Sequence, residues 1–137
     1  MAESFLLEIV TPSRKLLSKD VEEVSAPACM GEIGVLSGHA PMLTMLNPGV
    51  ISYKKGAESG AIAAGRGYAE VLPDKTTILI ETAELDSEID PESARQSLSK
   101  AEDALKNLTQ DDPGYQDASD SYELALARVR LKERHKG

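Results

Sequence analysis

The hydrophobic positions between residues 5 and 81 fall in short runs that turn residues interrupt. The clearest run, residues 76–81 (TTILIE), is rich in β-branched side chains, which favour strands. Turn signals recur about every 8 to 12 residues, a spacing that predicts a sandwich or a flattened barrel. The predicted strands are residues 5–10, 14–18, 21–25, 50–54, 60–64, 68–72 and 76–81, and Pro27 is expected to end the third.

A helical periodicity replaces this pattern after Leu85. Asp90, Pro91 and Glu92 form a helix start, with an N-cap, a proline at the first helical position and an acidic first turn. Apolar residues then recur every three or four positions, which predicts two helices folded back on each other as an antiparallel hairpin. The first stripe is Ala94, Leu98, Ala101, Leu105 and Leu108; after a break at residues 110–114 the second is Tyr115, Ala118, Tyr122, Ala125 or Leu126, and Val129.

The sequence therefore predicts an α+β fold with two domains. Residues 1–86 would form a β-sandwich or flattened barrel of short strands, and residues 87–137 an antiparallel two-helix hairpin. The seam between the helices is rich in alanine, so at about 25 cal/mol per Å² it gains only a few kcal/mol before entropy is subtracted. A hairpin held this weakly can open or leave the sandwich, as a regulatory element must.

Composition narrows the classes of function. The net charge of −8 argues against general nucleic-acid binding and against direct binding to anionic lipid. Cys29 is the only cysteine, which excludes a disulfide framework and favours a reducing compartment. We see neither a run of about 18 apolar residues nor a signal or transit peptide. The expected location is the cytosol, or the cytosolic face of a membrane through a partner.

Candidate chemistry is sparse. The segment Gly65-Arg66-Gly67 is too short to cradle a phosphate, and His39 and His135 are too far apart for a metal-ligand pair. Ser37 and His39 could form a nucleophile and its base, but no acidic residue is placed to orient the histidine. A structural turn is the simpler interpretation, so we expect no catalysis, no cofactor and no metal site.

The C-terminal end of the chain is basic. Its cations are Arg128, Arg130, Lys132, Arg134 and Lys136, against Glu133 alone. The helix macrodipole favours cations at a helix C-terminus, by less than about 1 kcal/mol each. The alternative is a basic tip that docks on an acidic partner surface. The two interpretations are compatible, and both stay open.

One stretch, residues 31–50 (GEIGVLSGHAPMLTMLNPGV), places glycine and proline at short intervals, so the chain must turn tightly several times there. Its segments GEIGVL, GHAP and PGV resemble, in order and spacing, the epsilon subunit of bacterial F-type ATP synthases. Residues 65–71 (GRGYAEV) are similar to the second motif of that family, with Arg66 splitting its glycine pair. The resemblance continues through the C-terminal helices.

The resemblance implies a non-catalytic rotor subunit in the central stalk of a proton-translocating ATP synthase, peripheral to the cytoplasmic face of the cell (inner) membrane. The sandwich would bind the gamma subunit and touch the c-subunit ring, which couples proton flow to ATP synthesis. The hairpin would extend toward the catalytic alpha and beta subunits and restrain ATP hydrolysis. Motif matching assigns Glu32 to the c ring, His39 and Pro41 to gamma, and Arg128, Arg130, Lys132 and Arg134 to the catalytic head.

Some epsilon subunits also bind ATP in the folded hairpin, through an Ile-Asp-x-x-Arg-Ala motif and arginines on the second helix. Ile89, Asp90 and Arg128 match this pattern. Ser93 replaces the first arginine and Lys132 replaces another, and lysine lacks the planar fork of arginine. We therefore expect ATP to bind weakly or not at all. A nucleotide-sensing regulatory module is the alternative function.

Overall fold

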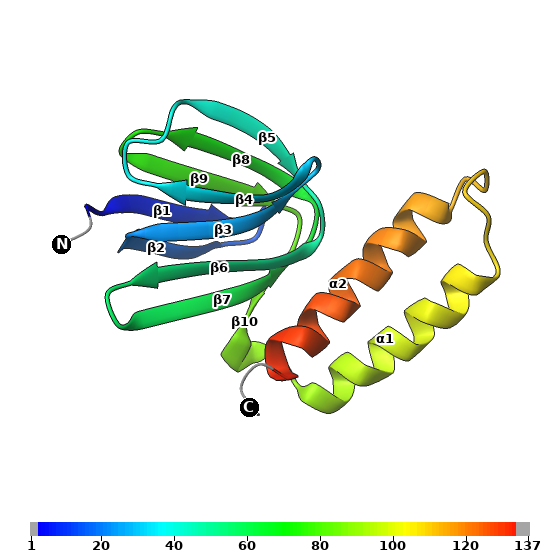
Figure 1. Cartoon of the computed structure of the whole chain (residues 1–137). Helices are drawn as coiled ribbons and strands as arrows, with labels where there is room; N and C mark the ends of the chain where they lie inside the picture. Colours follow the sequence, from blue (N-terminus) through cyan, green and yellow to red (C-terminus); the bar gives the residue numbers. More distant parts are fainter. Residues whose placement is uncertain (1–2, 134–137) are drawn as a thin grey trace.

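The computed structural model describes residues 3–133, and Figure 1 shows a strand-rich body followed by two antiparallel helices. This order confirms the predicted α+β fold. The strands are β1 (Phe5–Val10), β2 (Lys15–Val21), β3 (Glu23–Ala28), β4 (Gly31–Leu36), β5 (Met42–Leu46), β6 (Gly49–Lys55), β7 (Glu58–Ala64), β8 (Gly67–Leu72), β9 (Lys75–Ile80) and β10 (Ala83–Leu85). A 3₁₀ turn η1 (Asp86–Glu88) leads into the helices α1 (Pro91–Lys106) and α2 (Tyr115–Glu133).

The strands form two layers around one apolar core. Hydrogen-bonded neighbours follow the order β10-β7-β6-β3-β5-β8-β9-β1-β2, with β4 paired to β3. The path crosses between the layers where Ala28 of β3 pairs with Leu46 of β5. Strand β1 runs parallel to β9 and antiparallel to β2. Inward-facing aliphatic side chains fill the space between the layers; they include Leu7, Ile9, Val24, Ile51, Ile62, Val71 and Ile78.

Two details of the predicted strands are wrong. Residues 21–25 belong to two strands, because the chain bends at Glu22, whose backbone N–H donates to the carbonyl oxygen of Lys54 at 2.7 Å. Pro27 does not end β3, which pairs with β4 as far as Ala28. Strand β6 pairs with β3 only up to Ser25, so the missing N–H of Pro27 costs no pairing on that side.

The helical hairpin lies on one side of the sandwich, with α2 between the strands and α1 (Figure 1). Asp90 is the N-cap of α1, as predicted, and its carboxylate accepts a hydrogen bond of 2.9 Å from the backbone N–H of Ser93. Helix α2 also carries a second apolar face that the stripe analysis did not predict. There Ala127 and Leu131 pack with Ala63 of β7 in a small buried cluster, separate from the sandwich core.

Candidate functional site

An apolar face covers the outside of the layer that contains β5, β8, β9 and β1. One row of side chains crosses these strands in register, with Met45 opposite Tyr68, Tyr68 opposite Leu79, and Leu79 opposite Val10. Tyr68 and Leu79 are each 51% exposed, and Leu43 on β5 is 72% exposed. We call these five residues the apolar face. Contiguous apolar surface of this kind marks a site of interaction with another molecule.

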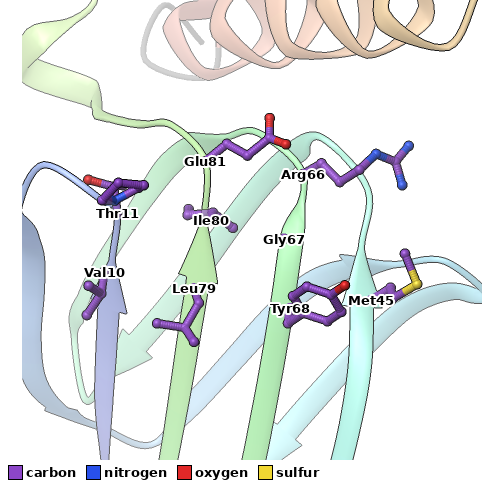
Figure 2. A pocket seen from close by; sticks show the side chains of 10 residues that line it. Val10, Thr11, Met45, Arg66, Gly67, Tyr68, Leu79, Ile80 and Glu81 are labelled. Carbon is purple, nitrogen blue, oxygen red and sulfur yellow. The ribbon is translucent and has the colours of Figure 1, made fainter.

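A hollow of about 470 Å³ lies at the end of the apolar face that is nearer the helices. Figure 2 shows Val10, Leu79, Tyr68 and Met45 side by side across the strands, with Arg66 and Glu81 at the rim toward the helices. The floor is apolar and the charged groups stand only at the edge. This arrangement suits an apolar side chain of a partner protein better than a charged small molecule.

The β3–β4 turn projects a second exposed group. Met30 is 94% exposed, and Gly31 adopts a φ of 124°, a conformation that favours glycine. Glu32 follows at the exposed start of β4. It also lines a groove beside α2 together with Glu123 and Arg130. Residues that the sequence assigned to different partners, Glu32 and Arg130, therefore border one groove in this structure.

The β4–β5 connection carries His39 and Pro41. The Nδ1–H of His39 donates to the carbonyl oxygen of Ala40 at 2.7 Å, and its backbone N–H donates to the carbonyl oxygen of Leu36 at 3.2 Å. Pro41 is exposed next to it. Because a neighbouring backbone group orients the imidazole, the geometry favours the structural turn over a Ser37–His39 nucleophile.

The C-terminal cations point to the junction between hairpin and sandwich. The Nε of Arg128 lies 2.8 Å from Oε1 of Glu84, and the arginine side chain is only 15% exposed. The Nζ of Lys132 donates to the carbonyl oxygen of Asp86 at 2.9 Å and lies 3.4 Å from its carboxylate. Arg130 is exposed, and Arg134 lies outside the described residues. In the folded hairpin, Arg128 and Lys132 are thus paired with acids of their own chain.

The candidate ATP ligands are engaged in the same way. Ile89 is buried in the cluster beneath α2, and Asp90 caps α1. Arg128 pairs with Glu84 and donates to Ser97 Oγ at 3.3 Å, so an acid already neutralises the matching arginine. This arrangement disfavours a polyphosphate at that position.

Over residues 3–133 we find no group of three or more His, Cys, Asp or Glu side chains that could bind a metal ion. In the same part of the chain, no helix combines the length and the apolar character that crossing a membrane requires.

Comparison with known proteins decides the family. Residues 4–86 match the family described as the beta-sandwich domain of the ATP synthase Delta/Epsilon chain, and residues 87–133 match its long alpha-helix domain. The chain belongs to the ATP synthase delta/epsilon chain family. This membership confirms the resemblance seen in the sequence.

Similar delta/epsilon chains are known from several bacteria. The ATP synthase epsilon chain of Trichlorobacter lovleyi is 49% identical over 131 residues, which cover 96% of this chain and 95% of that protein. The epsilon chain of Geobacter metallireducens is 45% identical with the same coverage.

Solved structures of ATP synthases contain the same fold. A chain in the cryo-EM structure of the Euglena gracilis mitochondrial enzyme aligns with a TM-score of 0.74 and 22% identity, over 98% of this chain and 82% of that one. A chain in the central stalk and c-ring structure from Tetrahymena thermophila aligns with a TM-score of 0.62 and 16% identity, over 99% and 98%. At these identities the likeness establishes the fold alone.

The sequence analysis of this delta/epsilon chain missed two features. The apolar face had a signal, because the unbroken run Ile78-Leu79-Ile80 places apolar side chains on both sides of β9. The second feature is an ion pair between Arg66 and Asp120, with Nε to Oδ2 at 2.8 Å. It had no signal, because the two residues lie far apart in sequence and neither belongs to a shared local pattern.

Proposed function

We propose that the chain is the non-catalytic central-stalk subunit of a proton-translocating ATP synthase, and that its apolar face binds the gamma subunit. The observation that carries this proposal is the row of exposed side chains across β5, β8, β9 and β1. The chain's own helices pack against β6 and β7 instead, and leave this face uncovered. A partner protein of the stalk would bury it.

The turns at one edge of the sandwich complete the rotor contacts. Glu32 would face the c ring, since it stands next to the projecting Met30. His39 and Pro41 would lie against gamma, because they connect β4 to β5, the strand that contributes Leu43 and Met45 to the apolar face. The closed two-layer body has the rigidity that torque transmission requires. Through these contacts proton flow is coupled to ATP synthesis, with the subunit peripheral to the cytoplasmic face of the membrane.

The hairpin supplies the restraint on ATP hydrolysis. We propose that residues 1–86 and 87–137 act as separate domains, and that the hairpin leaves the sandwich to reach the catalytic alpha and beta subunits. Arg128 and Lys132 would then exchange Glu84 and Asp86 for acids of the catalytic head, with Arg130 and Arg134 beside them. The support is that their present partners lie within the chain, so release exposes a basic surface. ATP binding in the folded hairpin is disfavoured, since Glu84 occupies the matching arginine.

A binding experiment tests the assignment of the apolar face. Tyr68→Glu and Leu79→Glu each place a charge in the centre of the face without touching the core. We expect each to weaken binding to purified gamma by roughly tenfold or more, because a charge in the core of an interface costs about 1.4 kcal/mol or more. Titration calorimetry on the folded variants measures this.

The matched control is Ala104→Glu, which adds the same charge on the exposed outer side of α1. Its affinity for gamma should equal that of the wild type. Unchanged binding by both Tyr68→Glu and Leu79→Glu would contradict the assignment.

A further inference from the structure

A bidentate ion pair joins the sandwich to the N-terminal half of α2. The Nε of Arg66 donates to Oδ2 of Asp120 and its Nη2 donates to Oδ1, both at 2.8 Å. The two side chains are 29% and 24% exposed, so both are mostly withdrawn from water. Gln116, one turn earlier on α2, donates to the same Oδ1 at 2.8 Å. Planar pairs of this geometry are stronger and more specific than single contacts.

The backbone fixes the position of Arg66 tightly. Arg66 sits between β7 and β8, where the N–H of Gly65 donates to the carbonyl oxygen of Thr82 at 2.9 Å. Its own carbonyl oxygen accepts from the N–H of Glu81 at 3.0 Å. A Cβ on Gly67 would collide with the carbonyl oxygen of Leu79, so only glycine permits this close crossing. The guanidinium therefore projects from a rigid corner of the sandwich toward the helix.

The two halves of α2 are attached to the sandwich differently. Its C-terminal half contributes Leu124, Ala127 and Leu131 to the buried cluster. The same half carries Arg128 and Lys132, with their acidic partners Glu84 and Asp86.

The N-terminal half, from Tyr115 to about Glu123, contributes nothing to that cluster in the part of the chain that the structure describes. Asp120 is the residue of this half that pairs with the sandwich. The signs are also reversed along the helix, because the sandwich presents a cation to Asp120 but acids to Arg128 and Lys132. This polarity specifies both the direction and the register of α2.

We propose that Arg66 is a latch that keeps the N-terminal half of α2 on the sandwich, and that breaking its pair with Asp120 frees that half before the apolar cluster opens. The residue that splits the glycine pair of the family motif thus positions the hairpin. The latch stands on the geometry alone. Its use in regulation rests on the proposed restraint of hydrolysis.

Hydrogen exchange on the isolated full chain tests the latch. In Arg66→Gln and in Asp120→Asn, the amides of residues 115–124 should exchange about 3- to 10-fold faster than in the wild type, since a partly buried bidentate pair exceeds the modest value of an exposed one. The double variant should exchange no faster than either single variant, because both changes remove one interaction. The reversed pair, Arg66→Asp with Asp120→Arg, should recover part of the protection.

The matched control is Arg95→Gln, which removes an exposed pair with Glu92 inside α1 and should leave residues 115–124 unchanged. Unchanged exchange in Arg66→Gln, or effects that multiply in the double variant, would overturn the latch. A separate arm measures ATP hydrolysis by the assembled complex, where Arg66→Gln should lower the rate because the hairpin extends more often. Faster exchange without a change in hydrolysis keeps the latch and counts against the restraint.

Discussion

Single charged residues tie neighbouring strands together at several places. Glu8 on β1 lies 2.8 Å from the Nζ of Lys15 on β2 and 2.8 Å from that of Lys75 on β9. These two lysines lower the pKa of Glu8 from 4.5 to about 2. Arg14, with help from the backbone N–H of Leu85, lowers the pKa of Glu88 to about 2 in the same way. Both carboxylates therefore favour the folded state only while they are ionised.

Glu8→Gln should lower the melting temperature at pH 7. Because the folded carboxyl group has the lower pKa, its contribution is complete above about pH 4.5 and disappears as the pH falls toward about 2. The melting curves of variant and wild type should therefore converge over that range. Added salt at pH 7 should also reduce the difference, since the lysines are partly exposed and screened. A difference that persists at pH 2 and ignores salt would contradict this account.

At the scale of elements, the β7–β8 corner shows how close contact limits substitution. We expect Gly67→Ala to lower the free energy of unfolding by about 1–3 kcal/mol, the usual cost of forcing atoms into a packed site. The added Cβ would lie 2.7 Å from Cα of Ile80, a backbone atom that cannot move aside cheaply. Denaturant titration measures the loss.

Gly34→Ala is the control for this substitution. Nothing lies within 4 Å of a Cβ at Gly34, and its φ is not positive, so the change should stay within about 0.5 kcal/mol. Equal losses for the two variants would show that glycine content, and not the close crossing at Gly67, determines stability.

The elements also show where sequence reasoning succeeds. Strand positions and the cap at Asp90 follow from local rules, because β-branched runs and capping side chains act within a few residues. The second face of α2 did not follow, since Ala127 and Leu131 complete a stripe only when Ala63 of β7 is known to lie opposite. Most of the site was hidden for the same reason. Its apolar face and its Arg66 pair depend on residues that only the folded chain brings together.

The whole molecule consists of a sandwich whose core is independent of the helices. Within residues 3–133, the sandwich core cluster draws on no side chain after Leu85, and the helices pack on a separate cluster. Truncation after Asp86 should therefore leave a sandwich that still assembles with gamma and the c ring. The complex should hydrolyse ATP faster, because the restraining hairpin is gone. Steady-state hydrolysis by reconstituted complexes measures this.

Two results of that truncation separate the parts of the proposal. Normal assembly with unchanged hydrolysis would remove the restraint and leave the stalk assignment intact. A control with Ala104→Glu in the full chain should match the wild type in both assembly and rate, because that side chain is exposed on α1.

The pairing of β1 with β9 has a consequence for how the chain is made. The first strand to leave the ribosome finds its parallel neighbour only when Ile78, the residue opposite Ile9, has been synthesised. Contacts of such long sequence separation form slowly and late. The nascent polypeptide must therefore carry its N-terminal strand without that neighbour through most of translation of the sandwich, so closure of this body is a late event in biogenesis.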